Sequence, residues 1–263
     1  AAASSSGGFE YRRIGSTSNA AITSVVKGSD IEKATELTIP ATINGLSVTT
    51  IDAGAFANNT VWKKINLPDS VTTIGSSAFY GLKSLTEIKI PKKVVDVGSS
   101  AFANCTSLKS VDFSASTLTQ LPMNMFSGCT SLNDVILPSG LNTIDEYAFN
   151  SCSSLKRIYV PASTSNINKT AFTKNGDITF YGVSGSTVKY FAYQNGYKFV
   201  PLETRQDRSD LNTILVSTSY KLKEDLSGYV QTTVENLNQE YNKAQQVYND
   251  FFQTQADIDN ATA

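Results

Sequence analysis

The sequence predicts a repeat solenoid, a curved stack of similar coils made mostly of short β-strands and tight helical turns, followed by an α-helical C-terminal segment. Two apolar rows with one period predict the stack, because a unit of about 23 residues cannot bury its own apolar face. Phenylalanine recurs at spacings of 23, 23, 24, 23 and 23 residues, at Phe56, Phe79, Phe102, Phe126, Phe149 and Phe172. The second row follows each phenylalanine by six residues, at Trp62, Leu85, Leu108, Leu132, Leu155 and Ile178. A change of composition after Leu202 predicts the helical segment.

Each unit is expected to form two walls and a turn. In residues 85–91, two isoleucines alternate with polar residues, which predicts a strand with its apolar face inward. Pro91 ends that strand, since proline donates no ladder hydrogen bond. Val94 and Val97 form a second inward pair on the opposite wall. Ser-Ala-Phe at 100–102 then predicts a tight helical turn whose phenylalanine fills the core between coils.

Three places depart from the regular unit. Leu118 to Phe126 is one residue longer and lacks the proline, so we expect a local bulge there. Asn44-Gly45 is the strongest two-residue hairpin pattern and predicts an N-terminal β-hairpin cap. Gly185 to Gly196 predicts a short helix with a glycine stop, and Tyr197 to Val200 a last strand, which together form a C-terminal cap.

The units resemble the BspA-type leucine-rich repeat, whose consensus runs roughly L-x-x-I-x-I-P-x-x-V-x-x-I-G-x-x-A-F-x-G/N-C-x-S. The resemblance covers about Phe9 to Leu202, and it is strongest in Thr-Ile-Gly-Ser-Ser-Ala-Phe (73–79) and Ala-Phe-Ala-Asn-Cys-Thr-Ser-Leu (101–108). It implies a leucine-rich-repeat solenoid from a bacterial protein that is secreted or exposed at the cell surface, with the export signal and the anchor outside this sequence.

The chain therefore divides into three predicted segments. Residues 1–8, which read AAASSSGG, are typical of a flexible linker, either the stalk left by a removed export signal or an added terminal tract. Residues 9–202 form the solenoid with its two caps. Residues 203–263 form a helical hairpin or a partial three-helix module.

Composition excludes several function classes. Hydrophobic residues make up 40% of the 263 residues, which is too apolar for disorder. Basic residues are spread along a chain of net charge −1, which argues against nucleic acid as a partner. There is no run of 18 apolar residues to span a membrane. The absence of histidine removes the commonest general base and zinc ligand. We expect no enzyme activity, cofactor or metal. A hydrolase that uses two carboxylates needs a facing pair, whereas Asp145 and Glu146 are sequence neighbours.

Cys105, Cys129 and Cys152 occupy one position of the repeat, which Leu82 fills in an earlier unit. That spacing predicts inward packing, where a free cysteine acts as a small hydrophobic residue. A disulfide between neighbouring coils stays open, because adjacent coils lie about 5 Å apart.

The outward strand positions are free to vary, and on a solenoid they line one face. The first half of this face is polar, from Lys64 to Asp112. The second half contains the candidate binding residues Asp134, Ile136, Arg157, Tyr159 and Phe180. Aromatic residues beside an arginine are typical of interface hot spots, so we expect a protein or glycan to bind there. The alternative is that the C-terminal cap covers them.

Beyond Leu202, apolar residues at steps of three and four predict an amphipathic helix of about 23 residues. They are Val230, Val234, Leu237, Tyr241, Ala244, Tyr248 and Phe251. With Thr-Gln-Ala-Asp-Ile-Asp-Asn-Ala at 254–261, this pattern resembles part of a FIVAR domain, a three-helix surface module. We expect a monomer; the alternative is a coiled coil that dimerises through residues 230–251.

These observations predict a non-enzymatic binding or adhesion module that recognises a protein or glycan through the outward strand face. The alternative is an accessory domain of a larger surface enzyme whose catalytic part lies outside this chain.

Overall fold

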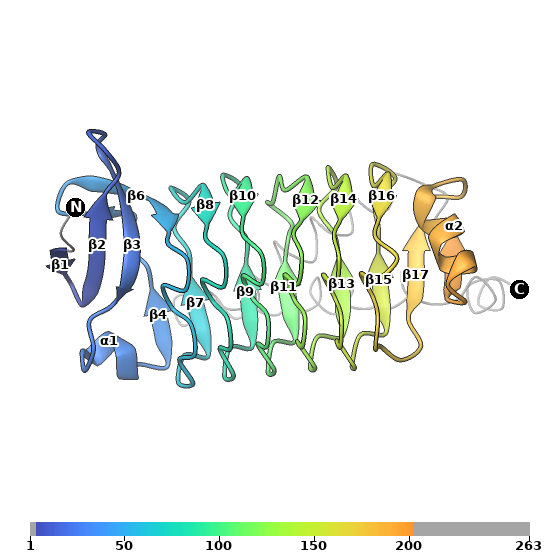
Figure 1. Cartoon of the computed structure of the whole chain (residues 1–263), viewed down its shortest axis with the longest axis horizontal. Coiled ribbons are helices and arrows are strands. Elements are labelled where there is room, and N and C mark those ends of the chain that lie inside the picture. The colour runs from blue at the N-terminus through green and yellow to red at the C-terminus, as the bar shows by residue number, and fades with distance from the viewer. Residues whose placement is uncertain (1–3, 202–263) are drawn as a thin grey trace, which may run out of the picture.

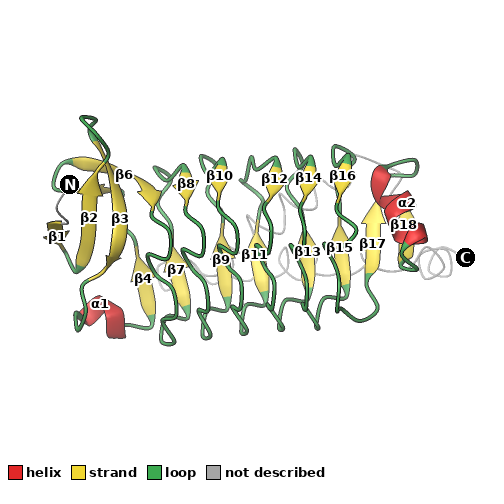
Figure 2. Cartoon of the chain, viewed as in Figure 1, coloured by secondary structure: helices red, strands yellow, loops and turns green. Residues whose placement is uncertain are grey.

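Two rows of short parallel strands run along the computed structural model, which describes residues 4–201 (Figure 1). The first wall contains β4 (Glu36–Thr38), β7 (Lys64–Asn66), β9 (Glu87–Lys89), β11 (Ser110–Asp112), β13 (Asp134–Ile136), β15 (Arg157–Tyr159), β17 (Thr179–Gly182) and β18 (Lys198–Pro201). The second wall contains β6 (Leu46–Ile51), β8 (Thr73–Ile74), β10 (Asp96–Val97), β12 (Gln120–Leu121), β14 (Thr143–Ile144) and β16 (Asn166–Ile167). Loops join the walls into coils (Figure 2), so the predicted solenoid is confirmed for these residues. The predicted helical C-terminal segment lies outside them.

The core is a continuous apolar column between the two walls. All six phenylalanines of the repeat are buried, and their rings stack from coil to coil with centroids 5.1 to 5.7 Å apart. The second row from Trp62 to Ile178 is buried as well. Each of the four inner rings is therefore packed on both sides by its equivalent in the neighbouring coils.

The corners that carry Ala-Phe are hydrogen-bonded turns, so the prediction of helical turns is wrong there. In one such turn, Ser100 and Asn104 have φ of 60° and 58° on either side of Ala101-Phe102. Left-handed residues end a right-handed helix, and they also aim the Phe102 N–H at the next coil, where Met125 O accepts it at 3.0 Å. Gly128 occupies the position of Asn104 one coil later, and a Cβ there would overlap Asn104 Oδ1.

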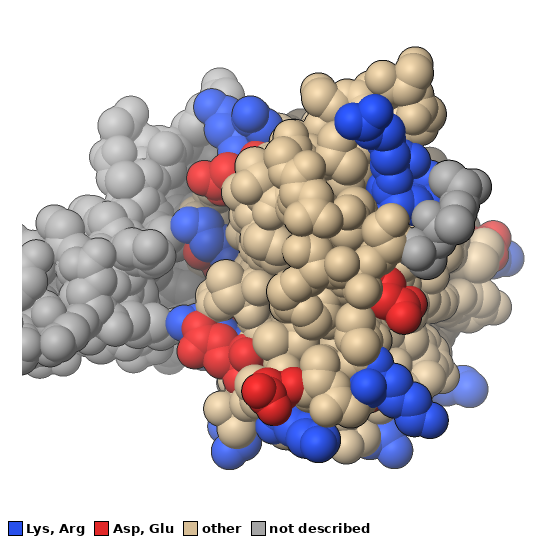
Figure 3. Space-filling view, turned by 90° about the vertical axis from the view of Figure 1, so that its left-hand side faces the viewer, with Lys and Arg blue, Asp and Glu red and all other residues tan. Residues whose placement is uncertain are grey.

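The N-terminal end is closed by an antiparallel layer of β1 (Ser4–Ser6), β2 (Phe9–Arg13) and β3 (Asn19–Val25). Residues 4–8 are consequently not a linker, and that prediction is wrong for them. Ser6 pairs with Phe9 across Gly7 and Gly8, whose positive φ values form a two-residue hairpin turn. Viewed from this end, acidic and basic side chains alternate around the rim and uncharged ones cover the centre (Figure 3).

Further contacts fasten this cap to the first coils. β3 pairs in parallel with β6, and Arg12 binds Asp52 with both nitrogen–oxygen distances at 2.7 Å. Trp62 Nε1 donates to Ile31 O at 2.7 Å, which holds the short helix α1 (Asp30–Lys33). The predicted hairpin is confirmed, since β5 (Thr42–Ile43) pairs with β6 around Asn44-Gly45.

The C-terminal end is closed by helix α2 (Thr187–Gln194) and strand β18, as the sequence predicts. Val188, Phe191 and Ala192 form the buried side of the helix. Gly196 follows the helix with a φ of 73°, which provides the expected stop. Phe191 lies 5.8 Å from Phe172, so the cap continues the phenylalanine column.

The longer unit interrupts both walls at once, where the sequence predicted only a local bulge. Within the described residues, β10 pairs with β8 but not with β12, and β11 pairs with β9 but not with β13. The turns and the core continue across the break: Asn104 N donates to Ser127 O at 2.7 Å, and Phe102 stacks on Phe126 at 5.7 Å. Phe113 packs edge-on against Phe126 and fills the space beside it. The first wall is thereby divided into two four-stranded sheets.

Substitution of one ring in the column tests how far the coils depend on one another. Phe102→Ala should lower the free energy of unfolding by about 3–5 kcal/mol, because the coils on either side cannot close the cavity. Val95→Ala is the control, since Val95 is 64% exposed and should change stability by less than about 0.5 kcal/mol. Denaturant unfolding measures both, and equal midpoints would contradict the stacked core.

Candidate binding face

The outward side of the first wall is the face that the sequence predicts to bind a partner. Strand pairing places its residues in register: Glu36 beside Lys64, Lys64 beside Glu87, and Glu87 beside Ser110. The intervening residues point into the core, as Ile88 does. We call the outward side of β4, β7, β9 and β11 the polar half, and that of β13, β15, β17 and β18 the aromatic half.

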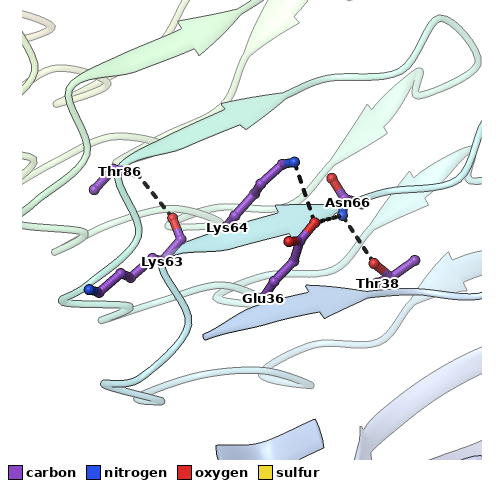
Figure 4. A network of polar contacts seen from close by, with 6 residues as sticks. All are labelled: Glu36, Thr38, Lys63, Lys64, Asn66 and Thr86. Carbon is purple, nitrogen blue, oxygen red and sulfur yellow. Dashed lines mark hydrogen bonds and ion pairs between the residues drawn. The ribbon is translucent and has the colours of Figure 1, made fainter. Parts of the chain in front are cut away.

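The polar half carries a network of exposed side chains at its N-terminal end (Figure 4). Lys64 Nζ lies 3.3 Å from Glu36 Oε1, and both side chains are 50% exposed. Asn66 Nδ2 donates to the same carboxylate oxygen at 2.6 Å and to Thr38 Oγ1 at 3.0 Å. The hydrogen bond from Asn66, followed by the hydrogen bond and charge of Lys64, lowers the pKa of Glu36. The Glu36 carboxylate is therefore ionised at neutral pH. An acidic and a basic side chain, Glu36 and Lys64, thus lie on neighbouring strands of this face.

Asp134 and Arg157 lie at the start of the aromatic half and form a bidentate pair. Arg157 Nε lies 2.7 Å from Asp134 Oδ1, and Arg157 Nη2 lies 2.5 Å from Asp134 Oδ2. The two side chains are only 31% and 15% exposed, so each largely satisfies the other. The bidentate geometry fixes the orientation of the guanidinium relative to the carboxylate.

Phe180 is wrongly predicted as an outward residue. It pairs with Ile158 and is fully buried in the core, where its ring lies 5.0 Å from Phe172. The strand-to-strand step is one residue shorter here, from Ile158 to Phe180, and a one-residue shift reverses the side on which every side chain lies. Tyr181 takes the outward position instead.

Tyr159 and Ile136 are outward, but they are not exposed aromatic or aliphatic anchors. Tyr159, Tyr181 and Val200 form a small apolar cluster separate from the main core, and Ile136 packs against it. Tyr159 is 9% exposed and Tyr181 only 1%. The structure thus brings Asp134, Ile136, Arg157 and Tyr159 together, as predicted, but in a largely buried arrangement. Their role in binding stays a prediction.

The C-terminal cap displays two tyrosines that the sequence reasoning missed. Tyr190 and Tyr193 on α2 are 60% and 61% exposed. Lys189 Nζ lies 6.0 Å from the centroid of the Tyr193 ring, and Phe199 packs edge-on against that ring. Helical periodicity could have found them, because they lie opposite the buried side of the predicted helix.

The three cysteines are buried and free, as the packing interpretation predicts, and no two of them are disulfide-linked. Their thiols also have a polar partner. Cys105, Cys129 and Cys152 each lie with Sγ 3.2 Å from the carbonyl oxygen of a repeat phenylalanine one coil earlier. In the last coils, Asn175 Nδ2 donates to Phe149 O at 2.9 Å and Tyr197 OH donates to Phe172 O at 3.1 Å. The carbonyl oxygen of the repeat phenylalanine therefore accepts a side-chain hydrogen bond there as well.

Burial also makes these thiols weakly acidic. It raises the pKa of Cys152 from 9.0 to about 12, and it raises the pKa of Cys129 well above 9.0. A thiolate is the reactive form of cysteine. The three cysteines therefore act as packing residues and are not suited to act as nucleophiles.

The residues that the structure describes contain no group of three or more His, Cys, Asp or Glu side chains arranged to hold a metal. Asp145, one of the two neighbouring acids, accepts a hydrogen bond from Gln120 at 2.5 Å. No helix among residues 4–201 is long and apolar enough to cross a bilayer.

Residues 49–179 match, in six copies, a family described as the BspA type Leucine rich repeat region. Residues 49–179 are a BspA-type leucine-rich-repeat region. The resemblance that the sequence suggested is thus confirmed for this part. The FIVAR-like segment lies outside the described residues and outside the matched range.

Solved structures agree on the fold. A leucine-rich repeat protein of T. pallidum is 24% identical, with a TM-score of 0.56, over 76% of this chain and 99% of that one. A leucine-rich repeat protein from Eubacterium ventriosum ATCC 27560 is 29% identical, with a TM-score of 0.50, over 60% of this chain and 48% of that one. The chain therefore spans about half the length of the second protein. Comparison with curated proteins gives no match.

The thiol pKa gives a direct prediction for chemical labelling. A pKa of about 12 in place of 9.0 lowers the thiolate population of Cys152 at pH 8 by about a thousandfold. A Cys105→Ala, Cys129→Ala variant, which retains Cys152, should thus react with a thiol reagent only as it unfolds. Absorbance of the released reagent measures the rate, and the same variant in guanidinium is the control. Rapid labelling of the native protein would contradict the buried geometry.

Proposed function

We propose that this chain is a non-enzymatic binding or adhesion module that recognises a protein or glycan partner through the outward strand face of its solenoid. One observation carries the proposal: inward strand positions repeat from coil to coil, while outward positions change. Ile65, Ile88 and Val111 are all inward and aliphatic. The residues that precede them are Lys64, Glu87 and Ser110. Core packing requires apolar residues at the inward positions. The outward positions are free to vary and can contact a partner.

The geometry of the polar half supports an extended partner. Adjacent strands place successive side chains about 4.8 Å apart, so charges and hydrogen-bonding groups form a regular row. Lys64, Glu36 and Asn66 begin this row, and the Asp134–Arg157 pair lies beyond its other end. The row suits the repeating polar groups of a glycan or an extended protein segment better than a compact small molecule, for which a concave pocket is typical.

Secretion or display at the cell surface belongs to the same proposal. It is supported by the BspA-type repeat, whose resemblance implies bacterial surface proteins. An accessory domain of a larger surface enzyme is the alternative, and a catalytic domain encoded in the same gene would favour it.

Reversal of one charge in the polar half tests the face. With a partner identified on glycan and protein arrays probed with the full chain, Lys64→Glu should weaken binding about tenfold, or about 1.4 kcal/mol. The reason is that it places two acids, Glu36 and residue 64, side by side in the row. Lys83→Glu is the matched control, because Lys83 is exposed but lies off the strands. Surface plasmon resonance gives both affinities, and equal loss in the two variants would argue against this face.

A further inference from the structure

The C-terminal cap displays two tyrosine rings on one helix. Helix α2 lies at the opposite end of the solenoid from β2 and β3 (Figure 1). Tyr190 and Tyr193 on this helix are 60% and 61% exposed. The other large apolar side chains exposed among residues 4–201 lie one to a repeat unit, at Val61, Val95, Met123 and Tyr147. Single exposed apolar residues are ordinary at a protein surface, whereas neighbouring ones are typical of a binding site.

Helical spacing brings these rings to one face together with two polar groups. Residues three and four apart on a helix are neighbours, with Cβ atoms about 5–6 Å apart. Tyr190, Tyr193 and Gln194 are related in this way, and Lys189 comes four residues before Tyr193. Lys189 Nζ lies 6.0 Å from the centroid of the Tyr193 ring, and Gln194 is exposed. The face therefore combines two flat rings, an amide and an ammonium group.

The packing beneath the helix holds this face in place. Val188, Phe191 and Ala192 bury the opposite side of α2. Phe199 on β18 packs edge-on against the Tyr193 ring, with centroids 6.3 Å apart and an interplanar angle of 74°. A tyrosine has only two side-chain torsions, so a ligand that contacts it immobilises little. The face is consequently preorganised for a rigid ligand.

The charge at this end of the solenoid is mainly positive. Between residues 160 and 201, Asp177 is the single acidic residue. The same stretch contains four basic residues, Lys169, Lys174, Lys189 and Lys198. A positive field of this kind attracts anions, and the ammonium group beside the Tyr193 ring disfavours a cationic ligand there.

We propose that this face of α2 binds an acidic polysaccharide, with sugar rings on Tyr190 and Tyr193 and a sugar carboxylate paired with Lys189. The C–H groups of a sugar ring carry partial positive charge, which suits the negative face of an aromatic ring. The Gln194 amide both donates and accepts hydrogen bonds, as sugar hydroxyls do. The carboxylate accepts a charge-assisted hydrogen bond from the ammonium group. Each group on the face thus has a counterpart in a uronic acid unit.

The size of the face favours a sugar over a folded protein. A stable protein–protein interface takes about 800 Å² and about 20–30 residues from each partner. Helix α2 has only eight residues, and part of it is buried in the cap. Tyr190 and Tyr193 are separated by less than one helical turn, which matches the contact made by one or two sugar rings.

This site goes beyond the proposed function, which concerns the outward strand face. Lys64, on β7, belongs to the N-terminal part of that face, whereas α2 follows β17 at the other end of the solenoid (Figure 1). Lys64→Glu should therefore leave binding at α2 unchanged. Each proposal has its own variants, so either can fail alone.

Titration calorimetry of the full chain with a short oligogalacturonate, a chain of uronic acid rings, tests the proposal. The fully methyl-esterified oligomer is the matched ligand, because it keeps the rings and loses the charges. The native protein should bind the acid about fivefold more tightly than the ester, as expected for one exposed ion pair. Tyr193→Ala should weaken binding at least about tenfold, whereas Tyr193→Phe, which keeps the ring, should bind within about twofold. Tyr147→Ala is the control, since it removes an exposed tyrosine from another repeat unit.

A second pair of variants tests the charge. Lys189→Gln should abolish the preference for the acid over the ester, whereas Lys83→Gln, exposed and away from the cap, should retain it. Unchanged melting temperatures show that the variants fold. Equal binding by the native protein and Tyr193→Ala would overturn the proposal, and so would equal affinity for acid and ester or no binding at all. Tighter binding of poly-glutamate, lost in Tyr193→Ala, would assign the face to an acidic protein segment and overturn it as well.

Discussion

The contact between equivalent phenylalanines of neighbouring coils is the constraint on which the rest of the structure depends. Each ring is stacked at 5.1 to 5.7 Å, and the backbone around it is bonded in both directions along the stack. The Phe102 N–H, for example, donates to Met125 O of the next coil, and Ala101 O accepts from the Phe79 N–H of the previous coil. A coil cannot bury this residue alone, so folding and stacking are one process.

This constraint explains several choices of residue that otherwise look unrelated. Left-handed turn residues bring the chain round without a helix and keep the phenylalanine backbone facing its neighbours. Gly98 is needed because a Cβ there would overlap Ser76 N of the adjacent coil. Cysteine suits its position because it fills an apolar site while contacting a buried carbonyl, and Asn175 makes the equivalent contact in the last unit through its amide nitrogen. The same column also carries the stack across the longer unit, where both strand ladders are interrupted.

The interruption has a consequence for the surface. It divides the first wall into two sheets, and the chemistry of the outward face changes at the same place. Before it, Lys64 and Asn66 form polar contacts in water. After it, Tyr159, Tyr181 and Val200 form a buried row. One regular scaffold thus presents two chemically different surfaces, one polar and one largely apolar.

The sequence by itself determined the period, the inward rows, the hairpin at Asn44-Gly45 and the cap helix with its glycine stop, because each depends on spacing or on local backbone preference. It also identified the cysteines as packing residues, since Leu82 shares their position. Three features were decided by tertiary structure. Gly7-Gly8 forms a hairpin because Ser4–Ser6 has β2 to pair with, which composition could not reveal. Phe180 turns inward because the last strand step is one residue short, and only register fixes a side chain's face. Tyr159 is buried in a cluster with Tyr181 and Val200 from the following strands of the sheet, and local sequence does not show which side chains strand pairing brings together.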